Sequence, residues 1–196
     1  LARSLDSGTS WRLENPGNFI GDAADHNAPQ PCPGVDFAHP DFAMRISGSR
    51  FFVSYSRGKS WQGPYQINLI DSPVSGEMTS RTDYIVQGTD ECLVFLSAET
   101  GLVQGAGYQD RCFCVRTTDG GKSFVFQGWM THDTESRSVM SSTVYIGEKH
   151  LVSVMRRKHG QVFNERPMIV HNWIEAAESR DDGKTWSFLA KVAQTD

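Results

Sequence analysis

Thr117-Thr-Asp119-Gly-Gly121-Lys-Ser-Phe124 follows the template Ser/Thr-x-Asp-x-Gly-x-x-aromatic, and the chain of 196 residues carries this template four times. The other copies are Ser4-Leu-Asp6-Ser-Gly8-Thr-Ser-Trp11, Ser54-Tyr-Ser56-Arg-Gly58-Lys-Ser-Trp61 and Ser179-Arg-Asp181-Asp-Gly183-Lys-Thr-Trp186. Their terminal aromatic residues lie 50, 63 and 62 positions apart. Such spacing indicates an internally repeated fold.

The template predicts a tight β-hairpin turn. Its Asp side chain can accept hydrogen bonds from turn N–H groups, its Gly can adopt a positive φ, and its aromatic ring can pack the turn against a sheet. Ser56 replaces the Asp in the second copy, so we expect a weaker and less rigid turn there. We assign structural rather than catalytic roles to the template positions, which are Asp6, Gly8, Trp11, Ser56, Gly58, Trp61, Asp119, Gly121, Phe124, Asp181, Gly183 and Trp186.

Short strand-like segments separate the copies. They cover residues 50–55, 80–86, 92–97, 111–116, 124–129, 142–146, 150–155, 172–178 and 186–192. Four short strands in roughly 60 residues, with a tight turn between the third and fourth, are typical of one blade of a β-propeller. Segment 151–155 is apolar on both faces, which favours a strand between neighbouring blades. We predict an all-β chain without helices, with loops at residues 29–41, 71–79, 99–110 and 131–141.

The composition supports a globular β protein. Aromatic residues make up 11% of the chain, and 18 Gly and 8 Pro supply turns. The formal net charge of −4 argues against nucleic acid as a partner, because nucleic-acid-binding domains carry basic patches. No window approaches the ~18 consecutive apolar residues that a membrane-spanning helix needs, so no membrane span is expected.

The four cysteines, Cys32, Cys92, Cys112 and Cys114, are too few to form a disulfide-built scaffold. Cys92 and Cys112 could face each other on neighbouring strands, but buried free thiols are the favoured interpretation. Cys112 and Cys114 form a C-x-C pair without a second Cys/His cluster at zinc spacing, so neither a metal nor a cofactor is expected.

The four copies resemble the Asp boxes, or BNR repeats, of the sialidase (neuraminidase) superfamily, and the resemblance covers nearly the whole chain. Sialidases of this type are six-bladed propellers, which implies about 360 residues at ~60 residues per blade. The resemblance therefore implies that residues 1–196 form one propeller segment. That segment would hold the last hairpin of one blade and about three further blades, and we expect it to be part of a longer chain.

The resemblance also implies a chemistry. Sialidases hold the carboxylate of an acidic sugar with an arginine cluster and use an Asp as acid/base and a Tyr nucleophile activated by a Glu. A neutral nucleophile avoids repulsion from the sugar carboxylate, and guanidinium groups bind that carboxylate bidentately. No cofactor or metal is implied.

Candidate arginines occur at three places in the chain. Arg156 and Arg157 end the strand-like segment 151–155 upstream of the fourth copy, as the second family arginine does. Arg45 lies in an Arg-Ile pair that resembles the first family arginine but lacks the following Pro. The alternative interpretation for Arg156 and Arg157 is an exposed basic pair at a strand end.

The segment Ser80-Arg81-Thr82-Asp83-Tyr84 combines an arginine with the two other residue types of the sialidase site. In a strand Arg81 and Asp83 would share one face. We predict Arg81 as a substrate-binding residue and Asp83 and Tyr84 as catalytic residues. The alternative is a structural ion pair between blades.

Two features depart from the family pattern. The Glu expected about fifteen residues before the second arginine is replaced by Met140-Ser-Ser-Thr143, and Glu135 is too early to take its place. The family's Tyr and third arginine have no counterpart in this chain. Histidines next to aspartates offer other polar pairs, although most such loop histidines are solvated. They are His26 beside Asp25, His39 near Asp41 and His132 beside Asp133.

Three functions follow from these observations. The first is a sialidase-type exo-glycoside hydrolase that acts on the terminal acidic sugars of glycans. The second is a propeller polysaccharide lyase with a His or Tyr base, and the third is a non-catalytic carbohydrate-binding propeller, because a fold does not fix a function. The resemblance implies a secreted, periplasmic or lysosomal protein.

Overall fold

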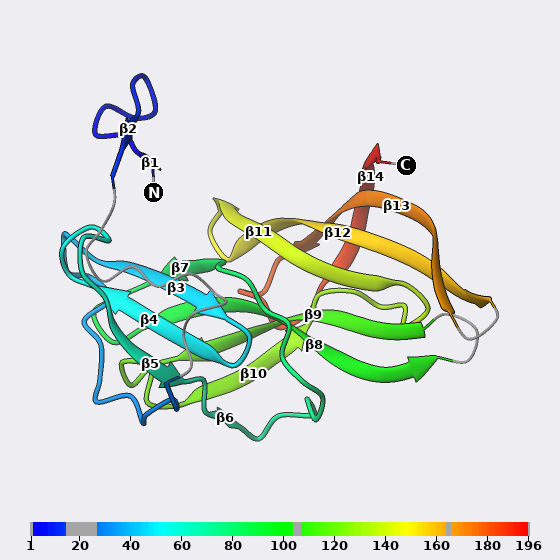
Figure 1. Ribbon diagram of the computed structural model, residues 1–196, viewed down its shortest axis with the longest axis horizontal. Coiled ribbons are helices and arrows are strands. Elements are labelled where there is room, and N and C mark those ends of the chain that lie inside the picture. Colours follow the sequence, from blue (N-terminus) through cyan, green and yellow to red (C-terminus); the bar gives the residue numbers. More distant parts are fainter. Residues whose placement is uncertain (1, 15–26, 104–106, 164–165, 196) are drawn as a thin grey trace.

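A computed structural model describes residues 2–14, 27–103, 107–163 and 166–195, and these residues form strands and connections without a helix (Figure 1). The predicted all-β class is therefore confirmed. The described strands form a two-stranded hairpin (β1–β2), a first sheet (β3–β5), a middle sheet (β6–β10) and a third sheet (β11–β14). Their bounds are β1 Ala2–Arg3, β2 Arg12–Leu13, β3 Ala43–Ser47, β4 Arg50–Ser54, β5 Gln62–Gln66, β6 Leu69–Ile70, β7 Tyr84–Val86, β8 Cys92–Val103, β9 Gly107–Thr117, β10 Phe124–Trp129, β11 Arg137–Gly147, β12 His150–Phe163, β13 Arg166–Ser179 and β14 Ser187–Gln194.

Consecutive strands are neighbours within each sheet, except that β6 pairs with β10 at the edge of the middle sheet and not with β7. The third sheet has the order β11-β12-β13-β14, and the middle sheet has the order β6-β10-β9-β8-β7. All pairs are antiparallel except β6 and β10, which are parallel. The third and fourth Asp-box copies lie between the third and fourth strands of the antiparallel runs β7–β10 and β11–β14, as the repeat spacing predicts.

All four Asp-box turns share one backbone conformation. The template Gly has a positive φ of 77–91° in every copy, and the residue before it also has a positive φ, as in a type I′ hairpin turn. In the third copy the Asp119 carboxylate accepts hydrogen bonds from Thr117 Oγ1 (2.8 Å), Ser123 N (3.1 Å) and Ser123 Oγ (2.6 Å). Ser56 takes the same place in the second copy with one hydroxyl instead of two carboxylate oxygens. The predicted turn chemistry is therefore present in the structure.

The middle sheet is covered on both faces. One face contributes Val94, Leu96, Phe113 and Val115 to a core shared with Met44, Ile46, Phe51 and Val53 of the first sheet. The other face contributes Leu93, Phe95, Cys112 and Cys114 to a second core shared with Leu151, Met155, Ala177 and Trp186 of the third sheet. Because side chains alternate along a strand, the central stretches Cys92–Leu96 of β8 and Cys112–Val115 of β9 are apolar on both faces. The three sheets therefore pack face to face in chain order.

The third sheet is covered on its inner face only, which we define as the face that packs on the middle sheet. On its outer face Val144, Ile146 and Val154 have exposed fractions of 56%, 59% and 37%. Among the described residues no second sheet covers this face, so the place of segment 151–155 between two sheets stays a prediction. A strand covered on both faces is found instead at Leu93–Leu96 of β8, where every side chain is buried.

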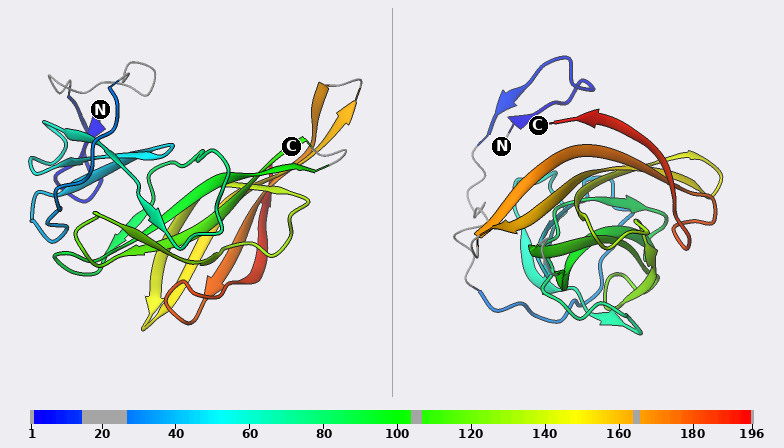
Figure 2. Two further views of the ribbon diagram at one scale, coloured as in Figure 1. Left: turned by 90° about the horizontal axis from the view of Figure 1, so that it is seen from below. Right: turned by 90° about the vertical axis from the view of Figure 1, so that its right-hand side faces the viewer.

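Several strands are longer than the apolar pattern predicted. The predicted loop at 99–110 is occupied mainly by the ends of β8 and β9, and β11 begins inside the predicted loop at 131–141. The hydrogen-bonded ladders continue through polar residues such as Asp110 and Arg137, which hydrophobic periodicity does not detect. Figure 2 shows that the extended ends of β8–β9 and β12–β13 project from the body of the sheets.

The structure also tests the expectations for the aromatic residue of the first Asp box and for the four cysteines. Trp11 is 67% exposed, so the aromatic residue of the first copy does not pin its turn against a sheet. All four cysteines are buried free thiols, and Cys92 and Cys112 belong to cores on opposite faces of the middle sheet.

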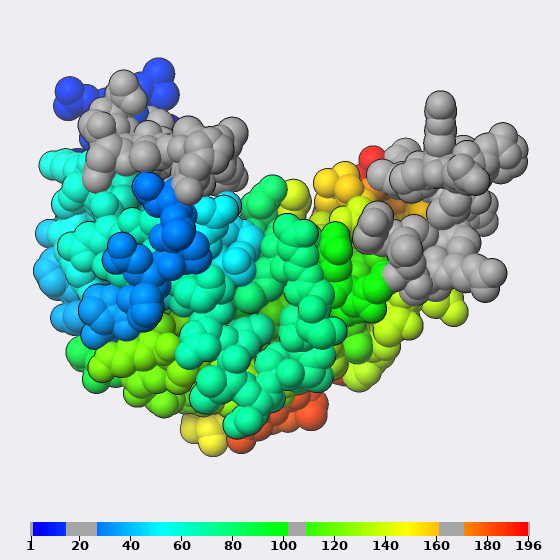
Figure 3. All heavy atoms as spheres, turned by 60° about the horizontal axis from the view of Figure 1, so that its bottom comes forward, coloured from blue at the N-terminus to red at the C-terminus, as the bar shows by residue number. Residues whose placement is uncertain are grey.

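Figure 3 shows the connection from β5 towards β7 lying across one face of the molecule beside the middle sheet.

Candidate functional site

Asp83 and Tyr84 contact different sheets. The Asp83 carboxylate accepts hydrogen bonds from Thr143 Oγ1 (2.9 Å) and Thr143 N (3.3 Å) on β11, whereas Tyr84 Oη accepts one from Met44 N (3.1 Å) on β3. Burial raises the pKa of both side chains, and hydrogen bonds from Ser141 and Thr143 oppose this rise for Asp83. The structure therefore does not bring the two predicted catalytic residues together.

Asp83 meets β11 at an irregular point of that strand. The β11–β12 register shifts between Val139 and Ser142, and Met140 within this bulge has a φ of 55°. Bulges re-aim side chains and are frequent beside functional sites. This bulge occupies the position where the sialidase pattern predicts a Glu.

Arg81 and Arg45 lie apart from Asp83. Arg81 is exposed and donates a hydrogen bond to the carbonyl of Ser80 (3.4 Å), and the alternative interpretation, an ion pair with Asp83, is not found between these two described residues. Arg45 lies over the ring of Phe52, with 4.8 Å between the guanidinium carbon and the ring centroid. Its role in substrate binding stays a prediction.

Arg157 is the largest fully buried side chain on the inner face of the third sheet. Its guanidinium donates to Glu175 Oε1 (2.8 Å) and also pairs with the carboxylate of Asp133. Asp133 is half-exposed, while the Glu175 carboxylate is largely buried. The Arg157 guanidinium, which the sequence predicts to bind a substrate carboxylate, is thus already paired with two carboxylates of the protein.

Arg156 lies on the outer face of β12, because neighbouring residues of a strand point to opposite faces. Its register partner is Val139, and the next same-face pair along the ladder is Lys158 with Arg137. Burial lowers the pKa of Lys158, and the nearby charges of Arg156 and Arg137 lower it further. Three cations are therefore gathered at this end of β11 and β12.

One carboxylate belongs to this group. Asp110 is buried at the polar end of β9, accepts hydrogen bonds from Arg137 Nε (2.7 Å) and Thr79 Oγ1 (3.2 Å), and favours the charged form of Lys158. We call Arg137, Arg156, Lys158 and Asp110 the basic cluster. With three cations and one carboxylate it carries excess positive charge. The sequence alone did not indicate the other three members of this cluster. The β11–β12 register brings Arg137 and Lys158 close to Arg156, and Asp110 joins them from β9.

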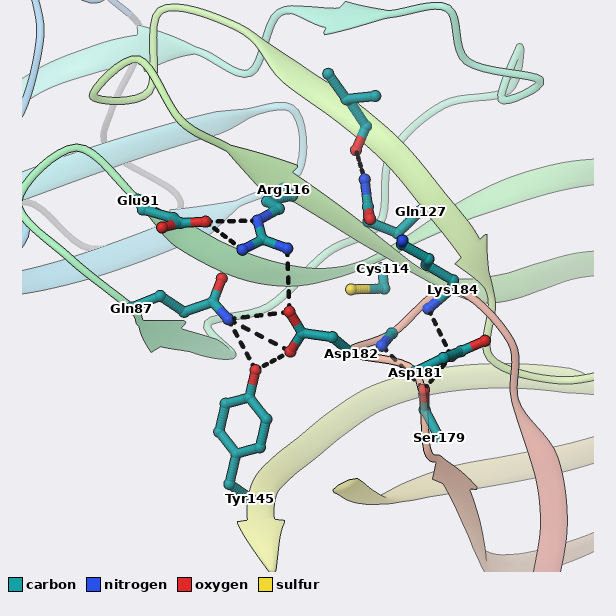
Figure 4. Close-up of polar contacts among 12 residues, drawn as sticks. Gln87, Glu91, Cys114, Arg116, Gln127, Tyr145, Ser179, Asp181, Asp182 and Lys184 are labelled. Atoms are coloured by element: carbon teal, nitrogen blue, oxygen red, sulfur yellow. Dashed lines mark hydrogen bonds and ion pairs between the residues drawn. The ribbon is translucent and has the colours of Figure 1, made fainter. Parts of the chain in front are cut away.

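A second charged network lies beside the fourth Asp box (Figure 4). Arg116 of β9 pairs with Glu91 and with Asp182 Oδ2 (3.0 Å). Tyr145 of β11 donates a hydrogen bond to Asp182, and Gln87 Nε2 donates to Tyr145 Oη (2.8 Å). Burial and the Asp182 carboxylate raise the pKa of Tyr145. These contacts join the middle and third sheets, so we assign the network a structural role.

Of the histidine–aspartate pairs, the two that the structure describes have other hydrogen-bond and ion-pair partners. His39 Nδ1 accepts a hydrogen bond from the backbone N–H of Asp41 (3.1 Å), and the Asp41 carboxylate pairs with Arg57. His132 Nε2 contacts the carbonyl of Trp186, while Asp133 pairs with Arg157. His26 and Asp25 lie outside the described residues.

Within the described ranges, no group of three or more His, Cys, Asp or Glu side chains could hold a metal ion. Nor does any helix in this part of the chain have the length and apolar character needed to cross a membrane.

No protein-family model and no curated protein matches this chain. Among solved structures it is similar to a protein of unknown function from Dyadobacter fermentans. The two share 18% sequence identity with a TM-score of 0.52, and the match covers 70% of this chain. The match covers 36% of the other chain, so this chain corresponds to about a third of that protein's length. At this identity the likeness concerns the all-β fold alone.

Proposed function

We propose that this chain is part of a sialidase-like Asp-box propeller and that it binds the terminal acidic sugars of glycans. The excess positive charge of the basic cluster is the observation that carries this proposal. Asp110 neutralises only part of the positive charge of Arg137, Arg156 and Lys158, and a sugar carboxylate would neutralise more of it. The planar guanidinium of Arg156 suits a bidentate contact with that carboxylate.

The arrangement of the sheets supports the propeller. The first, middle and third sheets pack face to face in chain order, and each has an Asp-box turn before its last strand. The outer face of the third sheet presents valine and isoleucine side chains of the kind that the middle sheet buries. A further sheet packed on the part of this face that holds Val144 and Ile146 would continue the same arrangement and leave the Arg156 end of the ladder uncovered.

Retention on a sialylated glycoprotein column tests the proposed binding. The chain should be retained on fetuin and should pass through asialofetuin, from which the terminal acidic sugars have been removed. The double variant R156A/K158A should elute early from fetuin. R12A/K59A, which loses the same charge at two exposed positions outside the cluster, should be retained like the wild type. Equal retention of both double variants would contradict the proposal.

Sialidase-type hydrolysis is the second candidate function. The raised pKa of Asp83 favours it, because a general acid must hold its proton near the operating pH. Arg156 and Asp83 contact opposite faces of the third sheet, which makes binding without hydrolysis the better-supported function. Turnover of a fluorogenic sialoside, but not of neutral or uronic-acid glycosides, would establish hydrolysis if D83N abolished it.

A further inference from the structure

A cleft of about 570 Å³ lies at the inner face of the third sheet and shares no lining residue with the basic cluster. Two aromatic side chains, Trp173 of β13 and Phe188 of β14, line it. The other lining side chains that matter here are polar, namely His159, His171, Lys191 and Gln194. A mainly apolar wall with a few polar groups at its rim is the usual composition of a small-molecule site.

The indole of Trp173 is held in a fixed orientation. Its Nε1 donates a hydrogen bond to Glu175 Oε2 (3.1 Å), and Glu175 is in turn fixed by Arg157. The guanidinium carbon of Arg157 lies 5.6 Å from the centroid of the indole, and Lys191 Nζ lies 5.7 Å from it. Phe188 is 62% exposed and stands at the wall of the same cleft. A rigid aromatic platform binds a flat apolar surface at low entropic cost.

The cleft carries little net charge. Lys191 is the one lysine, arginine or carboxylate side chain among the described residues that line it, and Glu175 lies opposite Lys191 in the β13–β14 register. The basic cluster has excess positive charge instead. The two places therefore suit ligands of different charge, and the cleft favours an uncharged one.

We infer that this cleft binds a neutral pyranose unit of a glycan. The apolar C–H face of the sugar ring stacks on Trp173 in place of the flexible Lys191 ammonium, which turns to the sugar hydroxyls, with Phe188 beside it. Its hydroxyl groups exchange hydrogen bonds with the histidines, Lys191 and Gln194 at the rim. This inference does not depend on acidic-sugar binding, since the basic cluster shares no residue with the cleft.

Calorimetric titration with four neutral hexasaccharides tests the inference. The probes are maltohexaose, cellohexaose, mannohexaose and N-acetylchitohexaose, each added to the full chain. At least one should bind, and W173A should weaken its binding about tenfold, the loss expected for one aromatic stacking contact. F188A removes an exposed ring without disturbing the core, so it should weaken binding while the circular dichroism spectrum stays unchanged. W11A removes an exposed indole elsewhere and should leave the affinity unchanged.

Failure of all four sugars to bind at millimolar concentration would overturn the inference. Unchanged affinity in both W173A and F188A would also overturn it, because binding would then occur elsewhere. The R156A/K158A variant separates the two sites: it should keep neutral-sugar binding even if acidic-sugar binding fails. Loss of neutral-sugar binding in R156A/K158A would contradict a separate cleft.

Discussion

At the scale of single residues, strand alternation decides which side chains are free to meet a ligand. Arg156 and Arg157 are neighbours in sequence, yet Arg157 is enclosed between two carboxylates and Arg156 belongs to a cluster with excess positive charge. Asp83 and Tyr84 are separated in the same way, because each reaches a different sheet. Adjacent polar residues in a strand therefore rarely serve one site.

Replacing Arg157 should destabilise the fold. R157M leaves the largely buried Glu175 carboxylate without its partner, and breaking a buried ion pair in this way costs about 3 kcal/mol. Urea denaturation measures the loss. R180A removes an arginine that is 71% exposed and paired with Glu178, and it should change the free energy of unfolding by less than about 0.5 kcal/mol. Equal stability of R157M and the wild type would show that Arg157 is not a structural ion-pair residue.

Asp83 should make stability fall as pH rises. Its pKa is raised from 3.8 by burial, so the folded state binds this proton more tightly than the unfolded state. The resulting stabilisation is complete below the unfolded pKa and is lost as pH rises through the folded pKa. D83N cannot ionise, so its melting temperature relative to the wild type should increase between pH 4 and pH 7. A difference that is constant over this range would contradict a raised pKa.

At the scale of the elements, the Asp-box turn is the unit that the sequence specifies most completely. Its hydrogen bonds lie within residues 117–123, and the template predicts that Asp119 accepts one from a turn N–H, as it does from Ser123 N. The hydroxyl contacts of Asp119 with Thr117 and Ser123 add to that prediction. In the fourth copy, close packing against the middle sheet also requires a glycine at position 183. A Cβ atom on Gly183 would lie 2.8 Å from Cys114 Sγ, and its φ of 91° disfavours other residues.

The second turn can be improved. S56D supplies the second oxygen that the other copies use, and it should stabilise the chain by about 1 kcal/mol, the net value of one hydrogen bond. D119S makes the reverse change in the third copy and should destabilise by a similar amount. Thermal unfolding of the pair measures both effects. A loss of stability in S56D would show that the hydroxyl already satisfies this turn.

The lengths of the strands and the composition of the candidate site were less predictable. Apolar alternation ends before Asp110 and Arg137, but the backbone ladder does not. The basic cluster depends on the β11–β12 register and its bulge, which no local pattern encodes. Sequence reasoning could therefore predict Arg156 as a candidate without its neighbours, and it could not distinguish the environments of Arg156 and Arg157.

At the scale of the whole molecule, the repeats predict a succession of sheets, and three sheets do pack face to face. Burial is unequal, however. The middle sheet has two covered faces, whereas the third has one covered face and one exposed face on which Val144, Ile146 and Val154 form an apolar patch. Exposed apolar patches of this kind mark contact surfaces or promote association.

Lysine substitutions test this difference in burial. V144K/V154K places two charges on the outer face of the third sheet and should change the free energy of unfolding by less than about 1 kcal/mol while reducing self-association. V94K places one charge in a covered face and should prevent folding, because an unpaired charge is buried. Sedimentation velocity and circular dichroism measure both results. Unfolding of V144K/V154K would mean that this face is covered.

Recognition of a sugar carboxylate by the basic cluster is the central claim, and calorimetric titration with an α-methyl sialoside tests it most directly. The methyl ester of the same sialoside is the matched ligand without charge. We predict that the acid binds, that its affinity falls with added salt and in R156A/K158A, and that the ester does not bind the cluster. Equal affinity for the acid and the ester, or binding of the acid that R156A/K158A leaves unchanged, would contradict the account.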